Sequence, residues 1–194
     1  MRRVVTGIVR HEARLLAGIG LWVAGRTHGL GGGGRAFGYA RGQGAVLAGF
    51  GFVCVVETVA MAVLLRSWPV AHTVVLVLDV YTLVFVVGLY AAWQVRPHVL
   101  DAGTLRIRGG THVDLRVPLA RIAAVRRETR HTHERADGEL NLPVGSLTTV
   151  TLVLAEPVVY AGPLGRGRPV GLVRLHADAP DDLVREVAAA LTRA

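Results

Sequence analysis

The chain has 194 residues, with 22 Lys+Arg against 14 Asp+Glu, a formal net charge of +8 and a pI near 11.1. Its 52% hydrophobic content and mean hydropathy of +0.44 exclude a disordered chain, and its single cysteine excludes a disulfide scaffold. A high pI often indicates nucleic-acid binding, but these basic residues flank long apolar runs, as they do at a membrane edge.

Residues 1–43 precede the apolar part of the chain and carry seven Arg against the lone Glu12. Apolar residues at helical spacing from Val5 to Val23 predict an amphipathic helix in the cytoplasmic interface. The glycine run at 29–34, with further glycines at 38, 42 and 44, predicts a flexible linker. Five arginines are candidate contacts for anionic lipid headgroups: Arg3, Arg10, Arg14, Arg26 and Arg96. A topology signal without lipid binding is the alternative.

Residues 44–94 contain two near-continuous apolar stretches, 45–65 and 71–93. At about 1.5 Å per residue they reach roughly 32 and 34 Å, against a hydrocarbon core of about 30 Å. The connector from Arg66 to Val70 is short, so the pattern predicts an antiparallel transmembrane hairpin. The alternative, a helical pair in a soluble core, is disfavoured because such cores seldom keep this length without a polar stripe.

The arginines also predict the orientation of this hairpin. They concentrate before the first span, only Arg66 lies in the connector, and Arg96 follows the second span. The positive-inside rule then places both termini in the cytoplasm. We expect a multi-pass protein of a bacterial cytoplasmic (inner) membrane.

Two carboxylates interrupt the apolar stretches. Glu57 and Asp79 lie at equal distances from the connector, about 12 Å deep on antiparallel helices, so they are expected to meet as an intramembrane polar pair. An interhelical hydrogen bond, within one chain or between copies, is favoured over a proton or ion path because two helices cannot enclose a pathway.

Residues 95–194 switch to alternation typical of β-strands. The segments 104–108 and 112–117 around Gly109-Gly110 predict a hairpin, and 122–125, 146–155 (with a continuation to 160) and 171–177 predict further strands. Residues 126–145 are charged and turn-rich and predict a loop. The segment from Ala179 to Arg193 predicts an amphipathic helix, with Asp181 and Asp182 in its first turn.

The segments Leu105-Arg106-Ile107-Arg108-Gly109 and Val117-Pro118-Leu119-Ala120-Arg121-Ile122-Ala123-Ala124-Val125, after a transmembrane hairpin, resemble the bacterial PH-domain membrane proteins. This resemblance covers about residues 95–194 and the order of the elements. It implies a membrane α+β protein: a two-helix hairpin followed by a small antiparallel PH-like β-barrel or sheet capped by a C-terminal helix. It also implies a membrane-tethered binding or assembly module.

Several arginines are candidates for a ligand or partner surface: Arg106, Arg108, Arg116, Arg126, Arg127 and Arg130. His131, His133 and Glu134 form only a weak zinc pattern, so no metal and no cofactor is expected. Cys54 lies within a span and no Gly-x-Ser-x-Gly motif occurs, so no enzyme activity is expected.

The sequence therefore predicts a non-catalytic scaffold or regulatory module that binds a protein partner or a second copy of itself, together with membrane lipid. The alternative is a subunit of a transport or proton-coupled assembly that uses Glu57 and Asp79. Nucleic-acid binding is not expected, because acidic residues interleave with the arginines after residue 96.

Overall fold

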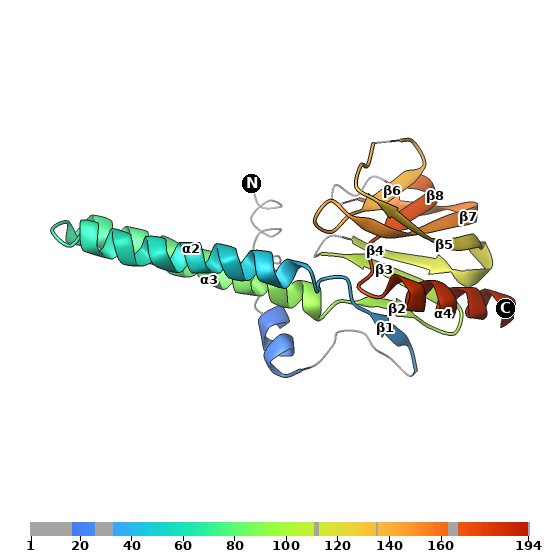
Figure 1. Cartoon of the computed structure of the whole chain (residues 1–194), viewed down its shortest axis with the longest axis horizontal. Helices are drawn as coiled ribbons and strands as arrows, with labels where there is room; N and C mark the ends of the chain where they lie inside the picture. Colours follow the sequence, from blue (N-terminus) through green and yellow to red (C-terminus); the bar gives the residue numbers. More distant parts are fainter. Residues whose placement is uncertain (1–16, 26–32, 111–112, 135, 163–166, 194) are drawn as a thin grey trace.

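The computed structural model describes residues 17–25, 33–110, 113–134, 136–162 and 167–193 (Figure 1). A long helical hairpin projects from one end of a β-rich domain, and the C-terminal helix lies against that domain. Two long apolar helices followed by largely antiparallel sheets and a C-terminal helix make an α+β protein, which confirms the coarse fold prediction.

The hairpin consists of α2 (Gln43–Leu64) and α3 (Pro69–Gln94). Pro69 occupies the first turn of α3, where its missing N–H would have no intrahelical partner in any case. Partly or fully buried positions recur in steps of three and four along each helix: Gly44, Leu47, Gly51, Cys54, Thr58 and Met61 on α2, and Val75, Asp79, Thr82, Val86 and Leu89 on α3. At the end of α3, Gly88, Ala91 and Ala92 are buried as well. This repeat of 3.5 residues is the packing seam of a coiled helical pair.

The rest of the hairpin surface is apolar and exposed. Both helices are long and apolar enough to cross a membrane, with mean hydropathies of 2.2 and 2.3. Large side chains such as Phe52, Val63 and Val77 are more than half exposed. Monomeric soluble proteins rarely expose apolar patches larger than a few hundred square ångströms.

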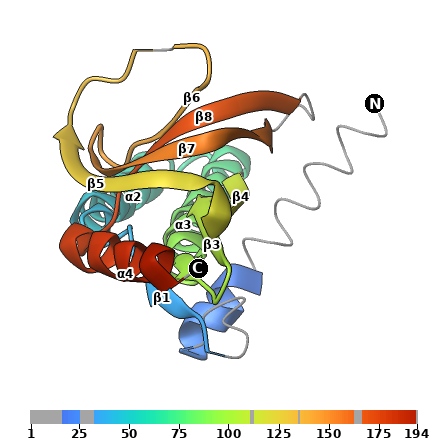
Figure 2. The same ribbon diagram turned by 90° about the vertical axis from the view of Figure 1, so that its right-hand side faces the viewer.

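The β-domain contains two four-stranded sheets (Figure 2). The first has the order β1-β2-β3-β4 and is antiparallel throughout, with the bounds β1 (Arg35–Phe37), β2 (His98–Leu100), β3 (Thr104–Gly109) and β4 (Val113–Pro118). A 3-10 turn, η1 (Leu119–Arg121), leads into the second sheet, whose order is β5-β7-β8-β6. Its bounds are β5 (Ile122–Arg130), β6 (Glu139–Leu142), β7 (Thr148–Ala161) and β8 (Gly167–Leu175).

The core lies between the two sheets and helix α4 (Pro180–Arg193). Leu105 and Ile107 of β3 and Leu152 of β7 have no exposed surface, because alternate side chains of each strand point inward. Leu183 and Val187, four residues apart on α4, are also fully buried and complete the core. The amphipathic C-terminal helix is thus confirmed.

Three local predictions are wrong. Residues 126–130 continue β5, because the pairing with β7 extends through bulges to Arg130 opposite Thr148, and residues 139–142 form β6. β6 pairs with β8 in parallel, whereas only antiparallel strands were expected. Residues 35–37 of the predicted linker form β1. This strand pairs with β2, although the whole helical hairpin separates the two strands in the sequence.

Candidate functional site

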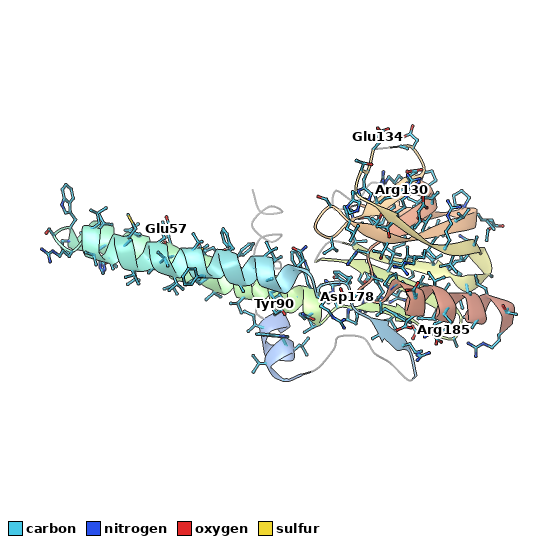
Figure 3. The ribbon with its side chains drawn as sticks, in the orientation of Figure 1. Glu57, Tyr90, Arg130, Glu134, Asp178 and Arg185 are labelled. Atoms are coloured by element: carbon cyan, nitrogen blue, oxygen red, sulfur yellow. The ribbon has the colours of Figure 1, made fainter. Side chains whose placement is uncertain are left out.

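The base of the hairpin is fixed to the β-domain at both chain crossings. α3 runs into β2 through only three residues, Val95 to Pro97. Before α2, the Arg41 backbone N–H donates to the Asp178 carboxylate at 3.1 Å, and the Asp178 N–H donates to the Gly38 carbonyl at 2.8 Å. A Cβ at residue 38 would lie 2.7 Å from Asp178 Oδ2, so a larger residue there would displace this carboxylate. Figure 3 places Asp178 and Tyr90 at this junction.

A cavity of about 450 Å³ lies at the same junction. Its walls come from the hairpin base, through Tyr39 and Trp93, and from the β-domain, through His98, Arg108 and His176. The volume falls within the range of about 300–1,000 Å³ that small-molecule sites occupy. No carboxylate lines this cavity among the described residues.

Arg108 is the most deeply buried charged residue of the described chain, with 1% of its surface exposed. The β3 alternation points Leu105 and Ile107 into the core and therefore points Arg106 and Arg108 to the outer face of the sheet. The hairpin base covers this face at Arg108. Its Nη1 donates to the Pro97 carbonyl at 3.4 Å, and its backbone N–H donates to His98 Nδ1 at 3.1 Å.

His98 is held as a neutral ring beneath the cavity. Burial lowers its pKa from 6.5 to about 4. Because Nδ1 accepts from the Arg108 N–H, the ring proton is assigned to Nε2, which donates to the His176 carbonyl at 3.0 Å. The Tyr39 ring packs on His98 with centroids 4.8 Å apart, and its hydroxyl accepts from the Gly110 N–H at 3.2 Å. Burial raises the pKa of Tyr39 to about 12, so both rings are uncharged at neutral pH.

The charge beside the cavity is predominantly positive. Asp114 binds Arg106 through two hydrogen bonds of 2.5 and 2.6 Å, and its pKa is lowered chiefly by that pairing. Arg96 lies 3.9 Å from the same carboxylate. Burial, followed by repulsion from Arg106, lowers the pKa of Arg108, but a guanidinium stays charged in proteins. Arg96 and Arg106 thus share one aspartate.

The predicted intramembrane pair is placed on two different surfaces. Glu57 is exposed on the outer face of α2, as Figure 3 shows, whereas Asp79 lies in the seam and lines a small gap with Thr58 and Met61. Asp79 Oδ2 is buried and accepts no hydrogen bond in the described chain. The structure therefore does not bring the two carboxylates together within one chain, and a pairing between copies stays a prediction.

The six arginines of the predicted partner surface divide between the two sheets. Arg116 is exposed on β4, and Arg106 is held by Asp114. The β5 arginines are exposed and ion-paired: Arg126 and Arg130 with Glu128, and Arg127 with Asp181. Arg108 differs from the other five because it is buried in the cavity wall and not exposed.

Among the described residues, the structure brings together no site from the remaining candidates. Of the predicted lipid contacts, Arg3, Arg10, Arg14 and Arg26 lie outside the described residues, and Arg96 lies at the hairpin base. His133 Nε2 lies 2.9 Å from the Thr148 hydroxyl, and the described residues contain no cluster that could hold a metal ion. Cys54 is a free thiol in the helix seam.

Sequence reasoning missed Tyr39 and the role of His98. Tyr39 lies in the glycine-rich stretch that was interpreted as a linker, and His98 belongs to no motif of the sequence. One feature of the sequence could have indicated this site. Few residues separate the end of the second apolar stretch from the first predicted strand, so the ends of the helices must lie against the ends of the strands. Comparisons of the chain with protein-family models, curated proteins and solved structures give no match.

Proposed function

We propose that this protein is a membrane-anchored, non-catalytic binding module of a bacterial inner membrane. In this proposal the hairpin spans the bilayer, both termini are cytoplasmic, and the two-sheet domain with its C-terminal helix is a PH-like domain held against the cytoplasmic surface. The observation that carries the proposal is the continuous exposed apolar surface of α2 and α3, which ends where the β-domain begins.

Two further features support a β-domain that is held in one position relative to the hairpin. The crossing from α3 to β2 takes only three residues, and Asp178 holds the chain before α2. Arg41 and Arg96 flank the two helix ends at this level, as the positive-inside rule requires of the cytoplasmic side.

The partner in this proposal is a protein that contacts the exposed arginines of β5, or a second copy of the chain. β5 is an edge strand of the second sheet, and its arginines Arg126 and Arg130 present positive charge beside Glu128. The alternative, a transport or proton-coupled subunit, needs Glu57 and Asp79 in one site. Because Glu57 faces outward and Asp79 faces the seam, such a site would have to form between copies.

Crosslinking in intact membranes followed by native mass spectrometry separates these functions. We compare the unaltered chain with two double variants, Arg126→Glu/Arg130→Glu in the domain and Glu57→Gln/Asp79→Asn in the hairpin. A binding module keeps its partner when the hairpin acids are neutralised and loses it when the β5 charges are reversed. The opposite pattern, or a self-assembled ring abolished only by the hairpin variant, would contradict the proposal and support the alternative.

A further inference from the structure

We propose that two copies of this chain associate inside the membrane through one face of α2, where the Glu57 side chains of the two copies form a hydrogen bond with each other. This inference rests on the proposed membrane anchoring, and it adds a partner and a contact surface outside the β-domain. The pairing gives each carboxyl group the hydrogen-bond partner that its own chain lacks.

Glu57 is placed where a single hairpin leaves it against lipid. It is exposed on the outer surface of the hairpin (Figure 3). At about 1.5 Å per residue, its distance from Leu65 at the end of the apolar stretch places it roughly 12 Å deep. Ionisable residues within spanning helices almost always face other protein groups or a water-filled cavity, and they pair with one another. The protein that covers this face must therefore bring a polar atom to the same depth.

The hairpin itself supplies no partner for this carboxyl group. Neither α2 nor α3 contains Lys or Arg, and Asp79, the other carboxyl group, lies in the seam. The hydroxyl of the adjacent Thr58 donates to the Cys54 carbonyl of its own helix at 2.8 Å. Within the described chain, Glu57 forms no hydrogen bond and no ion pair. A protonated carboxyl group donates through its O–H to an oxygen of another carboxyl group, so a second Glu57 satisfies the first.

Glu57 is flanked by exposed apolar residues that follow the same side of α2. This Glu57 stripe repeats in steps of four and three residues: Val46, Phe50, Val53, Glu57, Ala60 and Leu64. At about 100° per residue, the stripe lies about a quarter turn from the seam that packs on α3. Each helix of a four-helix bundle contacts two neighbours, so α2 can keep its seam with α3 and pack its Glu57 stripe against a second hairpin.

Symmetry favours a second copy as the occupant of this stripe. Around a two-fold axis along the membrane normal, the same surface of α2 meets itself, and residue 57 of one copy lies opposite residue 57 of the other at the same depth. A single polar position in an otherwise apolar helix seam also fixes the register and the number of helices. Both β-domains then lie on the same side of the bilayer, as the proposed orientation requires.

The experiment measures association of the full chain in phosphatidylcholine vesicles. In a Cys54→Ala background, Ala189→Cys on α4 carries a donor or an acceptor dye, and energy transfer is followed as lipid dilutes the chain. Glu57→Leu removes the polar group, whereas Glu57→Gln keeps a side chain that forms hydrogen bonds. Phe50→Ala truncates the Glu57 stripe. Phe52→Ala is its matched control, because Phe52 is also exposed but lies on the other side of α2.

We expect the unaltered chain, Glu57→Gln and Phe52→Ala to associate equally well, and Glu57→Leu and Phe50→Ala to raise the dissociation constant about tenfold or more. Leucine is more apolar than glutamate, so Glu57→Leu still spans the membrane and a loss of association reports on the contact itself. Absence of energy transfer in the unaltered chain, or equal association of Glu57→Leu, would overturn the proposal.

Disulfide formation tests the two-fold geometry. Val53 lies on the Glu57 stripe one turn from Glu57, whereas Val55 is exposed on the other side of α2. Oxidation in vesicles should link two copies through Val53→Cys and not through Val55→Cys. Linkage through Val55→Cys alone would overturn the proposed contact.

The failure of this inference is distinguishable from the failure of the proposed function. A monomeric chain that still binds a protein partner through β5 would overturn the association through Glu57 alone. Release of the chain from vesicles by alkaline carbonate would instead contradict the membrane anchoring on which both depend.

Discussion

Acidification is predicted to destabilise the protein through His98. The ring is 2% exposed, donates to the His176 carbonyl and accepts from the Arg108 N–H, so the folded state has no room for a second ring proton. In the unfolded chain the same ring has its ordinary pKa of 6.5, whereas in the folded chain the pKa is about 4. Between these values only the unfolded state binds the proton, and the free energy of unfolding must fall as the pH falls.

The magnitude follows from the two pKa values. One pKa unit corresponds to 1.36 kcal/mol, so a decrease from 6.5 to about 4 removes about 3 kcal/mol of stability between pH 7 and pH 4. Above pH 6.5 both states carry a neutral ring and this contribution is constant. Asp114, whose folded pKa is lowered, loses its contribution only below its ordinary value of 3.8 and stays outside this window. His176, whose pKa is also lowered, acts in the same direction as His98.

The assay is denaturant unfolding of the full chain in mild detergent at several pH values between 4.5 and 7, followed by near-ultraviolet circular dichroism. His98→Asn is expected to lower the stability at pH 7 and to flatten most of the pH dependence, leaving the part due to His176. His131→Asn, in an exposed turn, is the control and should keep the full slope. An unchanged slope in His98→Asn would refute the reasoning.

Three other changes test the packing at the junction and in the core. Gly110→Ala is expected to lower the free energy of unfolding by about 1–2 kcal/mol, because residue 110 has a positive φ of 55° and its Cβ would lie 3.2 Å from Trp93 Nε1. Equilibrium unfolding measures the loss, and Gly171→Ala, which has open space around its Cβ, is the comparison. Arg174→Ala removes the ion pair between β8 and Glu139 on β6, and it should lower the free energy of unfolding by about 2–3 kcal/mol. Arg185→Ala, which removes the exposed pair with Asp182, should cost less than about 1 kcal/mol. Equal losses in the two variants would contradict the assigned burial of Arg174. Asp178→Ala should speed hydrogen exchange of the Arg41 amide at least tenfold while the amides of α4 keep their protection, and unchanged exchange at Arg41 would mean that Asp178 does not hold this crossing.

The elements that the sequence predicts well are those whose signal is local. The two apolar stretches, the hairpin around Gly109-Gly110, the strands at β7 and β8 and the C-terminal helix each carry their own period of hydrophobicity. β1, β2 and β6 are three or four residues long and exist because of distant pairing, Arg35 with Leu100 and Leu140 with Val173. The arginine-rich end of β5 is largely exposed on both faces, so its sequence lacks the alternation of apolar and polar residues that predicts a strand.

The candidate site was only partly predictable for the same reason. Arg108 was identified as a functional candidate from the run of arginines on its strand, but its burial depends on how the helix ends meet the strand tips. The contact of Tyr39 with His98 joins residues from opposite sides of the hairpin. No local pattern contains that information.

The central claim, that the hairpin spans a membrane with the β-domain on the cytoplasmic side, is tested most directly by labelling from one side. In a Cys54→Ala background, single cysteines are introduced at Ser67 in the connector and at Ala189 on the exposed face of α4. The account predicts that an impermeant maleimide labels Ser67→Cys in intact spheroplasts and labels Ala189→Cys only after permeabilisation. Labelling of both positions from the outside, or release of the chain from membranes by alkaline carbonate, would contradict it.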